Sequence, residues 1–204
     1  TKFVGDIYGN TFFSNLTNTI TILNSNHSIS YFLETYFFDD CYFGSNLFLT
    51  NNKIYVSCST YYPFYNNNIE SFQTFFPKVY VYNILYDEHN NAYFLELINI
   101  LNDKYNDLFF GTSVFAVDKH LIIAGNSCIY QYYDQKFISN ISVPKSTYNY
   151  DYTLHILSSN VIVGNYMDDD LRGALFIGNI KDTTGGTSVD NISKIDKSSS
   201  NSIV

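Results

Sequence analysis

Two stretches of the chain repeat the same order of hydrophobic and polar positions. Residues 43–58 read FGSNLFLTNNKIYVSC and residues 110–125 read FGTSVFAVDKHLIIAG, and the two align without a gap. Each holds a Phe-Gly pair, a short apolar run, a polar turn and a second apolar run. The runs are short, rich in β-branched residues and without helical periodicity, so each stretch predicts a β-hairpin. Residues 150–165, YDYTLHILSSNVIVGN, form a third and weaker copy.

Two further strands are predicted after each hairpin. The first hairpin is followed by KVYVYNI at 78–84 and then NAYFLELI, and the second by CIYQYYD at 128–134 and then KFISNIS. The third is followed by GALFIGNI at 173–180. Each unit therefore predicts an up-and-down meander of four antiparallel strands. Such units, repeated about every 40 to 60 residues, are typical of β-propeller blades.

The two ends of the chain extend this pattern. TKFVGDIYGN at 1–10 is similar to the second strand of a unit, and NTITILN and SISYFLET supply the third and fourth strands. Residues 181–204 are polar, with a Gly pair and a Ser run, which predicts a linker or disordered tail. The expected fold class is all-β: a partial β-propeller of roughly three to four four-stranded antiparallel blades. We expect it to cover residues 1–180 and to start and end within a blade.

The composition agrees with a folded all-β chain. Hydrophobic residues make up 46% and charged residues 15%, and the 20 Tyr and 18 Phe favour pleated strands. The net charge of −8 repels nucleic-acid backbones and anionic lipid surfaces, so we expect no nucleic-acid partner. The sequence has no apolar run long enough for a membrane-spanning helix, so we expect no direct membrane span in this chain.

In the order of these repeated segments the chain resembles FG-GAP repeats, the blades of integrin α-subunit-like β-propellers. In that family Phe-Gly opens the first strand, a Gly-Ala-Pro-like segment ends the second, and a Val-Tyr-Val-Tyr-like third strand follows. The residues that match these elements are Phe43-Gly44 and Phe110-Gly111, then Gly5, Gly125 and Gly164, then Tyr80 and Tyr82. No unit has the complete Gly-Ala-Pro, and the third unit lacks Phe-Gly. An aromatic-rich meander or sandwich with coincidental Phe-Gly pairs is the alternative fold.

The resemblance implies a non-enzymatic protein-binding module, used in adhesion, receptor recognition or complex assembly in an extracellular, cell-surface or secretory setting. Family propellers have more blades than this chain supplies, so the partner would be another protein chain, or the remaining segment of the parent protein, that completes the propeller. One alternative is a structural assembly subunit whose propeller is completed in that way. Another is an enzyme whose catalytic groups lie on the missing blades.

The sequence predicts no catalytic site, metal site or cofactor. His27, His89 and His120 fall in predicted turns and His155 in a predicted strand, and none has a nucleophile motif nearby. The turns within the hairpins, TNNK, DKH and SSN, offer at most one carboxylate each, which is too few for calcium. The carboxylate pair Asp39-Asp40, just before a Phe-Gly pair, indicates a solvated loop.

Cys41 and Cys58 are candidates for a disulfide. A hairpin turn at Asn51-Asn52 would pair Ser45 with Cys58 and leave Cys41 four residues beyond the direct partner. A bulge or bend would be needed to bring the two sulfur atoms together. Cys128 is predicted to be a buried thiol.

The predicted partner-binding residues lie in two loops that emerge on the same face of the blades. The loop at 59–77 carries seven aromatic residues: Tyr61, Tyr62, Phe64, Tyr65, Phe72, Phe75 and Phe76. Clustered exposed rings are typical of interaction surfaces. The second loop is acidic and carries Asp168, Asp169 and Asp170. Alternatively, the rings fold back over their own blade or plug the axis of the ring, and the acidic loop is simply solvated.

Overall fold

The computed structural model of the chain describes the strands and several of the turns between them. The described residues are 2–5, 11–15, 19–23, 29–34, 42–50, 52–59, 77–103, 105, 107, 109–125, 128–143, 152–157, 160–165, 174–179 and 193–194. They contain strands and turns and no helix, so the described part of the chain is all-β, as predicted.

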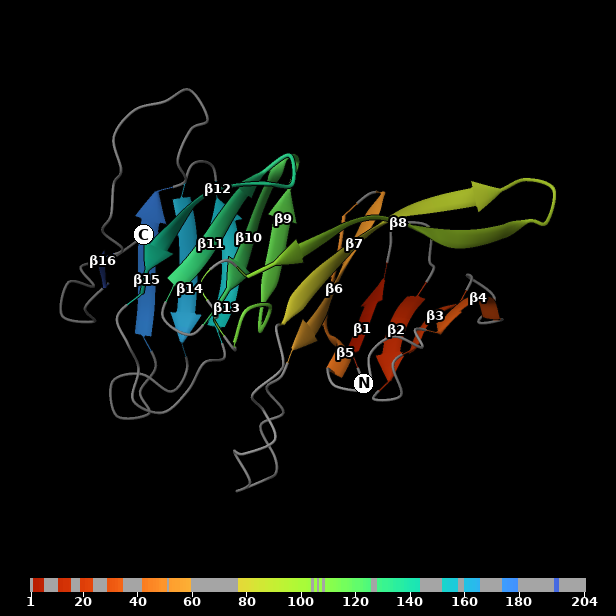
Figure 1. Ribbon diagram of the computed structural model, residues 1–204, viewed down its shortest axis with the longest axis horizontal. Coiled ribbons are helices and arrows are strands. Elements are labelled where there is room, and N and C mark those ends of the chain that lie inside the picture. The colour runs from red at the N-terminus through yellow and green to blue at the C-terminus, as the bar shows by residue number, and fades with distance from the viewer. Residues whose placement is uncertain are drawn as a thin grey trace, which may run out of the picture.

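The described strands form four sheets of four strands each, and within each sheet every strand pairs antiparallel with the next one in sequence (Figure 1). The first sheet contains β1 (Lys2–Gly5), β2 (Thr11–Asn15), β3 (Thr19–Leu23) and β4 (Ile29–Glu34). The second contains β5 (Tyr42–Leu49), β6 (Lys53–Ser59), β7 (Lys78–Asp87) and β8 (Ala92–Asn102). The third contains β9 (Val114–Val117), β10 (His120–Ala124), β11 (Cys128–Tyr133) and β12 (Lys136–Ser142). The fourth contains β13 (Tyr152–Leu157), β14 (Asn160–Asn165), β15 (Ala174–Asn179) and β16 (Ser193–Lys194).

The three predicted hairpins are present as β5–β6, β9–β10 and β13–β14, and their registers are equivalent. Leu47 pairs with Val56, Val114 with Ile123 and Leu154 with Val163. These pairs lie at the same distance from the start of each repeat, so the repeat in the sequence is also a repeat in three dimensions.

The first sheet differs from the expectation. Residues 2–5 form its first strand rather than its second, and the second strand is Thr11–Asn15, which pairs with both β1 and β3. The sequence TFFSN was not recognised as a strand because its two adjacent rings break the alternation of apolar and polar positions. Gly5 consequently ends a first strand, not a second one.

The fourth sheet extends into the predicted polar tail. Ser193 and Lys194 form β16, and they pair with Ile177 and Phe176 of β15. The remaining residues of the tail, 181–192 and 195–204, lie outside the described residues.

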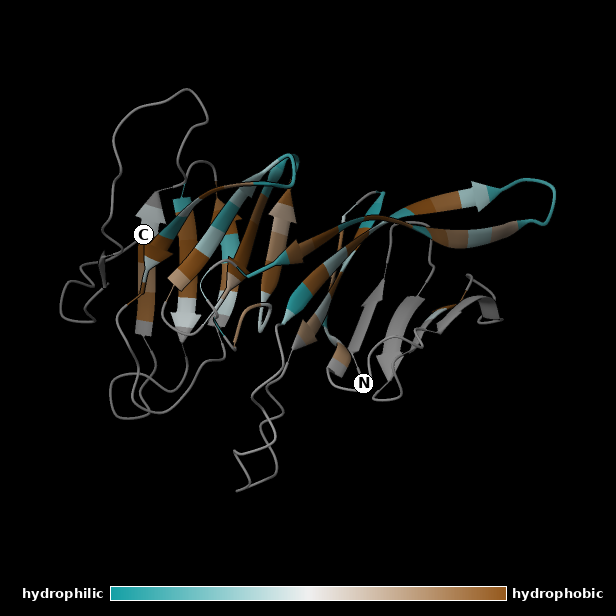
Figure 2. Cartoon of the chain, in the orientation of Figure 1, coloured by the Kyte–Doolittle hydropathy of each residue, from teal (hydrophilic) through white to brown (hydrophobic). Residues whose placement is uncertain are grey.

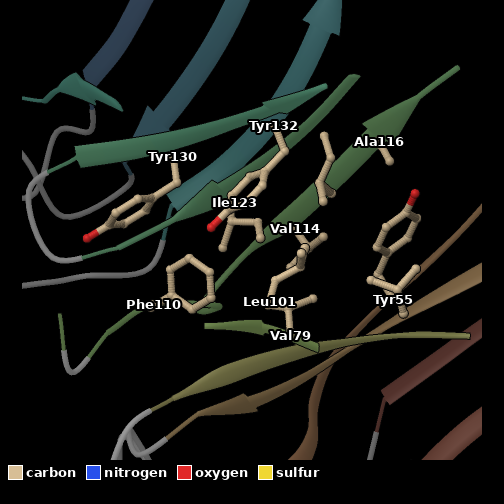
Figure 3. Packing of buried hydrophobic residues seen from close by; sticks show 11 residues of the cluster. Tyr55, Val79, Leu101, Phe110, Val114, Ala116, Ile123, Tyr130 and Tyr132 are labelled. Atoms are coloured by element: carbon tan, nitrogen blue, oxygen red, sulfur yellow. The ribbon is translucent and has the colours of Figure 1, made fainter. Parts of the chain in front are cut away.

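Successive sheets pack face to face through three hydrophobic cores. Side chains alternate between the two faces of a strand, so each inner sheet contributes to two cores. In β6, Ile54 and Val56 pack in the core shared with Ile22 of the first sheet, whereas Tyr55 packs in the core shared with the third sheet. Figure 3 shows this second core, in which Val79 and Leu101 face Val114 and Ile123.

The third core joins the third and fourth sheets, and the stack is open at its two ends. Ile122, Ile129 and Ile141 pack there against residues of β13 to β15. Figure 1 shows the first and fourth sheets at opposite ends of the stack, so the described sheets do not close into a ring.

Candidate functional site

Both predicted binding loops lie outside the described residues, apart from the flanking Ser59 and Pro77. The residues concerned are Tyr61, Tyr62, Phe64, Tyr65, Phe72, Phe75, Phe76, Asp168, Asp169 and Asp170. Each loop connects the second strand of its sheet to the third, and the aromatic loop is anchored where Cys58 pairs with Lys78. The structure therefore shows at which end of the second sheet the aromatic loop begins and ends. The role of this loop in binding stays a prediction.

The histidines in the described part of the chain do not meet one another. His89 is exposed in the turn between β7 and β8, and His120 begins β10 instead of lying in a turn. His155 in β13 packs edge-on against Phe115. His27 lies outside the described residues. Among the residues that the structure describes, no group of three His, Cys, Asp or Glu side chains could hold a metal ion.

The Phe-Gly pairs lie at the packed junctions between sheets. Phe43 and Phe110 are almost fully buried. Phe43 packs edge-on against Tyr80 of β7, with ring centroids 5.4 Å apart, and Phe110 packs edge-on against Tyr130 of β11, with centroids 5.0 Å apart. Figure 3 shows the second of these pairs. Two successive sheets thus use one arrangement, in which the phenylalanine at the start of the repeat packs against a tyrosine of the third strand.

Glycine is required beside Phe110 for two reasons. Gly111 has φ of +87°, in the left-handed region that favours glycine, and its N–H donates to the carbonyl oxygen of Ala124 over 2.9 Å. A Cβ atom at this position would lie 3.3 Å from Oγ of Ser57 and from Cγ2 of Val79, both in the preceding sheet. The glycine therefore permits close contact between neighbouring sheets. Gly44 has a similar φ of +81°.

Asp107 is a partly buried structural carboxylate that sequence reasoning missed. Its Oδ2 accepts a hydrogen bond from the hydroxyl of Tyr130 over 2.9 Å, and its Oδ1 accepts one from the N–H of Phe109 over 3.0 Å. Its own N–H donates to the Asp103 carboxylate. A carboxylate that caps a turn and accepts a tyrosine hydroxyl is not a solvated loop residue.

A signal for Asp107 was present in the sequence. Asp107 stands three residues before Phe110, and Asp40 stands three residues before Phe43. The solvated-loop interpretation of Asp39-Asp40 overlooked this shared spacing, although both of those residues lie outside the described part of the chain.

Burial raises the pKa of three weakly acidic side chains at the two Phe-Gly junctions, Tyr80, Cys128 and Tyr130. Burial, followed by its contacts with Cys128 and Asp107, raises the pKa of Tyr130. Burial raises the pKa of Cys128 to about 11 and that of Tyr80 to about 12. A thiol with so high a pKa is protonated at neutral pH, and the reactive form of cysteine is the thiolate. The raised pKa of Cys128 therefore disfavours the thiolate that nucleophilic chemistry would need.

The hairpin β5–β6 contains the bulge that the candidate disulfide requires. Phe43 pairs with Cys58, and the register shifts before Leu47 pairs with Val56. The bulge places Phe43, not Ser45, opposite Cys58, so Cys41 lies two residues beyond the direct partner instead of four. Cys58 is disulfide-bonded and Cys128 is a free cysteine. Because Cys41 lies outside the described residues, the Cys41–Cys58 pairing stays a prediction.

A second feature missed by sequence reasoning is the exposed apolar surface of the hairpin β7–β8. The large exposed side chains of this hairpin are Tyr86, Phe94, Leu97, Ile98 and Ile100. The sequence predicts only a fourth strand at 91–98, NAYFLELI, because the apolar residues of this segment do not reveal which of them a neighbouring sheet covers.

Comparison with models of known protein families and with curated protein sequences found no match. No helix that could cross a membrane occurs in the part of the chain that the structure describes. The function is therefore argued from the repeated geometry of the sheets.

Proposed function

We propose that this chain is part of an integrin-α-like β-propeller with FG-GAP-like repeats, and that it is a non-enzymatic protein-binding module. Such a module would serve in adhesion, receptor recognition or complex assembly. The observation that carries the proposal is the equivalence of Phe43–Tyr80 and Phe110–Tyr130 in two successive sheets. A recurring ring beside a left-handed glycine suits a blade junction, where neighbouring sheets must approach closely.

A row of rings along the first strands supports a radial arrangement of the sheets. Phe48, Phe115 and His155 each lie five residues after the first position of their repeat. The ring centroids of Phe48 and Phe115 are 4.8 Å apart, and those of Phe115 and His155 are 4.7 Å apart. The first strands of three successive sheets are therefore neighbours, as they are around the axis of a propeller.

One face of the fourth sheet is exposed, whereas the equivalent face of the second and third sheets is covered by the sheet that follows. Val79, Ile129 and Leu175 occupy equivalent register positions, opposite Ser57, Ala124 and Gly164. Val79 and Ile129 are fully buried by the following sheet, whereas Leu175 is 42% exposed. This contrast supports a further sheet, from another chain or from the rest of the parent protein, that packs on β13–β15. It also favours the second candidate function, a structural assembly subunit.

Deletion of residues 60–76 separates the two candidates. If the aromatic loop recognises a partner, the deletion variant should fold with an unchanged free energy of unfolding and lose the partner. If the loop is permanently buried in an assembly, the variant should be insoluble.

Native mass spectrometry and analytical ultracentrifugation test the open end of the stack. The wild-type chain should carry a companion chain or self-associate, and Leu175→Ser should reduce that association while leaving the fold intact. Val79→Ser is the matched control, because it removes an equivalent side chain that is already buried within the chain and should destabilise the fold. A stable, monodisperse wild-type monomer would contradict the proposal.

A further inference from the structure

The hairpin β7–β8 extends beyond the rest of its sheet. The strand β6 pairs with β7 only as far as Asn83, opposite Lys53. The pairing of β7 with β8 continues to Asp87 opposite Ala92. Figure 1 shows this two-stranded arm reaching past the neighbouring strands of the stack. One face of the arm packs in the first core through Leu95, with Ile84 and Tyr93 against it, whereas its edge is paired with no further strand among the described strands.

β8 is the last strand in the order of its sheet. Among the described strands, β8 is hydrogen-bonded only to β7 and ends the sheet order β5-β6-β7-β8. An edge strand presents unpaired N–H and C=O groups, and proteins commonly block long edges with lysine, proline or a cover. The segment Ala92–Asn102 contains neither lysine nor proline.

Several large apolar side chains of the hairpin β7–β8 are exposed. Their exposed fractions are 49% for Tyr86, 37% for Phe94, 48% for Leu97, 36% for Ile98 and 40% for Ile100. Figure 2 shows hydrophobic colouring along both strands of the arm up to its hydrophilic tip. Clustered exposure of this kind marks an interaction surface.

The charge of the arm selects the chemistry of its partner. The hairpin β7–β8 contains three carboxylates, Asp87, Glu88 and Glu96, and one lysine, Lys78, which pairs with Asn102 at the end opposite the tip. The Asp87 carboxylate accepts hydrogen bonds from the N–H of His89 over 2.9 Å and from Nδ2 of Asn90 over 2.6 Å, which hold the tip in a defined turn. Glu88 and Glu96 are exposed. The arm is thus apolar along its length and acidic at its tip and side.

We propose that the outer edge of β8 is a docking site for an extended apolar segment with basic flanks from a partner protein, which joins the sheet as an additional strand. Main-chain hydrogen bonds to β8 would supply affinity, and the exposed rings and carboxylates would select apolar and basic side chains. This site uses other residues than the predicted binding loop at 59–77, and the proposal stands whether or not the sheets belong to a propeller.

Two synthetic peptides test the proposal on the full chain. Both carry the segment Ile-Thr-Val-Thr-Ile, with two lysines at each end in one peptide and two glutamates at each end in the other. Fluorescence anisotropy should show the lysine-flanked peptide binding at least about tenfold more tightly at low salt, with the difference shrinking as salt rises. Hydrogen exchange should slow in Ala92–Asn102 on binding and stay unchanged in β10.

Charge variants make the test specific to the arm. Glu88→Gln/Glu96→Gln should remove most of the preference for the lysine-flanked peptide. Asp118→Asn/Asp134→Asn changes the net charge equally at exposed turns of the third sheet and should leave the preference intact. The proposal is overturned if neither peptide binds, if both bind equally, if protection appears on another strand, or if ultracentrifugation without peptide shows a dimer that depends on β8, in which case a second copy is the occupant.

Discussion

Tyr130 donates its hydroxyl hydrogen to Oδ2 of Asp107 over 2.9 Å, and this bond joins the third strand of the third sheet to the segment that precedes its Phe-Gly pair. The two residue types occur together along the chain. At the equivalent positions the repeats carry Asp40 with Tyr80, Asp107 with Tyr130, and Thr147 with Phe176. The repeat without the acidic residue also lacks the tyrosine hydroxyl. We infer that Asp107 and Tyr130 act as a unit at the junction of the third sheet.

This pairing predicts non-additive stability effects. Tyr130→Phe and Asp107→Thr should each lower the free energy of unfolding by about 1–3 kcal/mol, because each leaves a buried polar group without its partner. The double variant, which copies the residue types of the third repeat, should lose less than the sum of the two. Urea denaturation of all four proteins measures the coupling, and strict additivity would show that the hydrogen bond does not stabilise the fold.

The close packing at the junction predicts contrasting effects of two glycine substitutions. A Cβ atom on Gly125 would lie 2.7 Å from Cε2 of Tyr130 and closer still to Oδ2 of Asp107. Gly125→Ala should therefore destabilise the protein by about 1–3 kcal/mol. Gly164→Ala is the matched control, because its Cβ atom would make only ordinary contact with Thr153, at 3.6 Å or more. Equal melting temperatures for the two variants would refute this geometry.

The buried acids predict loss of stability at alkaline pH. The pKa of Cys128 is raised from 9.0 to about 11 and that of Tyr80 from 10.0 to about 12, in both cases mainly by burial. As the pH rises, the unfolded chain loses these protons before the folded chain does, so the unfolded state is favoured progressively. The stabilisation is complete below pH 9 and is lost as the pH rises towards 12. Urea denaturation at pH 8 and near pH 11 should show a clear decrease, and an unchanged unfolding free energy would exclude the effect.

The cysteines predict a defined pattern of modification. In the native protein at neutral pH, iodoacetamide should leave Cys128 largely unmodified because its thiol is protonated and partly buried. Peptide mapping without reductant should recover Cys41 linked to Cys58, since the bulge in β5–β6 shortens the offset between them. Recovery of Cys58 linked to a cysteine of a second chain would instead indicate a covalent dimer.

The sequence predicted what is local and missed what depends on distant partners. The three hairpins were predictable because each consists of two apolar runs around a tight turn, as in Leu47 to Val56. The strand at Thr11–Asn15 was missed because adjacent rings hide its alternation, and β16 because Ser193 and Lys194 form a strand only through pairing with β15.

The candidate site was predicted least well, for the same reason. In the sequence Asp107 has the pattern of a loop residue. Its structural role depends on a hydrogen bond from Tyr130, which lies 23 positions later in the chain. The exposure of Phe94 and Ile100 depends on which elements pack over each face of β8, and the pattern of apolar residues in β8 does not contain that information.

The stacking of successive sheets is tested most directly by nuclear Overhauser effects between side-chain rings, in protein that is deuterated except at Phe and His. The account predicts contacts between Phe48 and Phe115 and between Phe115 and His155, which lie on the first strands of three different sheets. If backbone amide contacts across the hairpins are observed while both of these inter-sheet ring contacts are missing, the sheets do not stack in chain order and the propeller proposal fails.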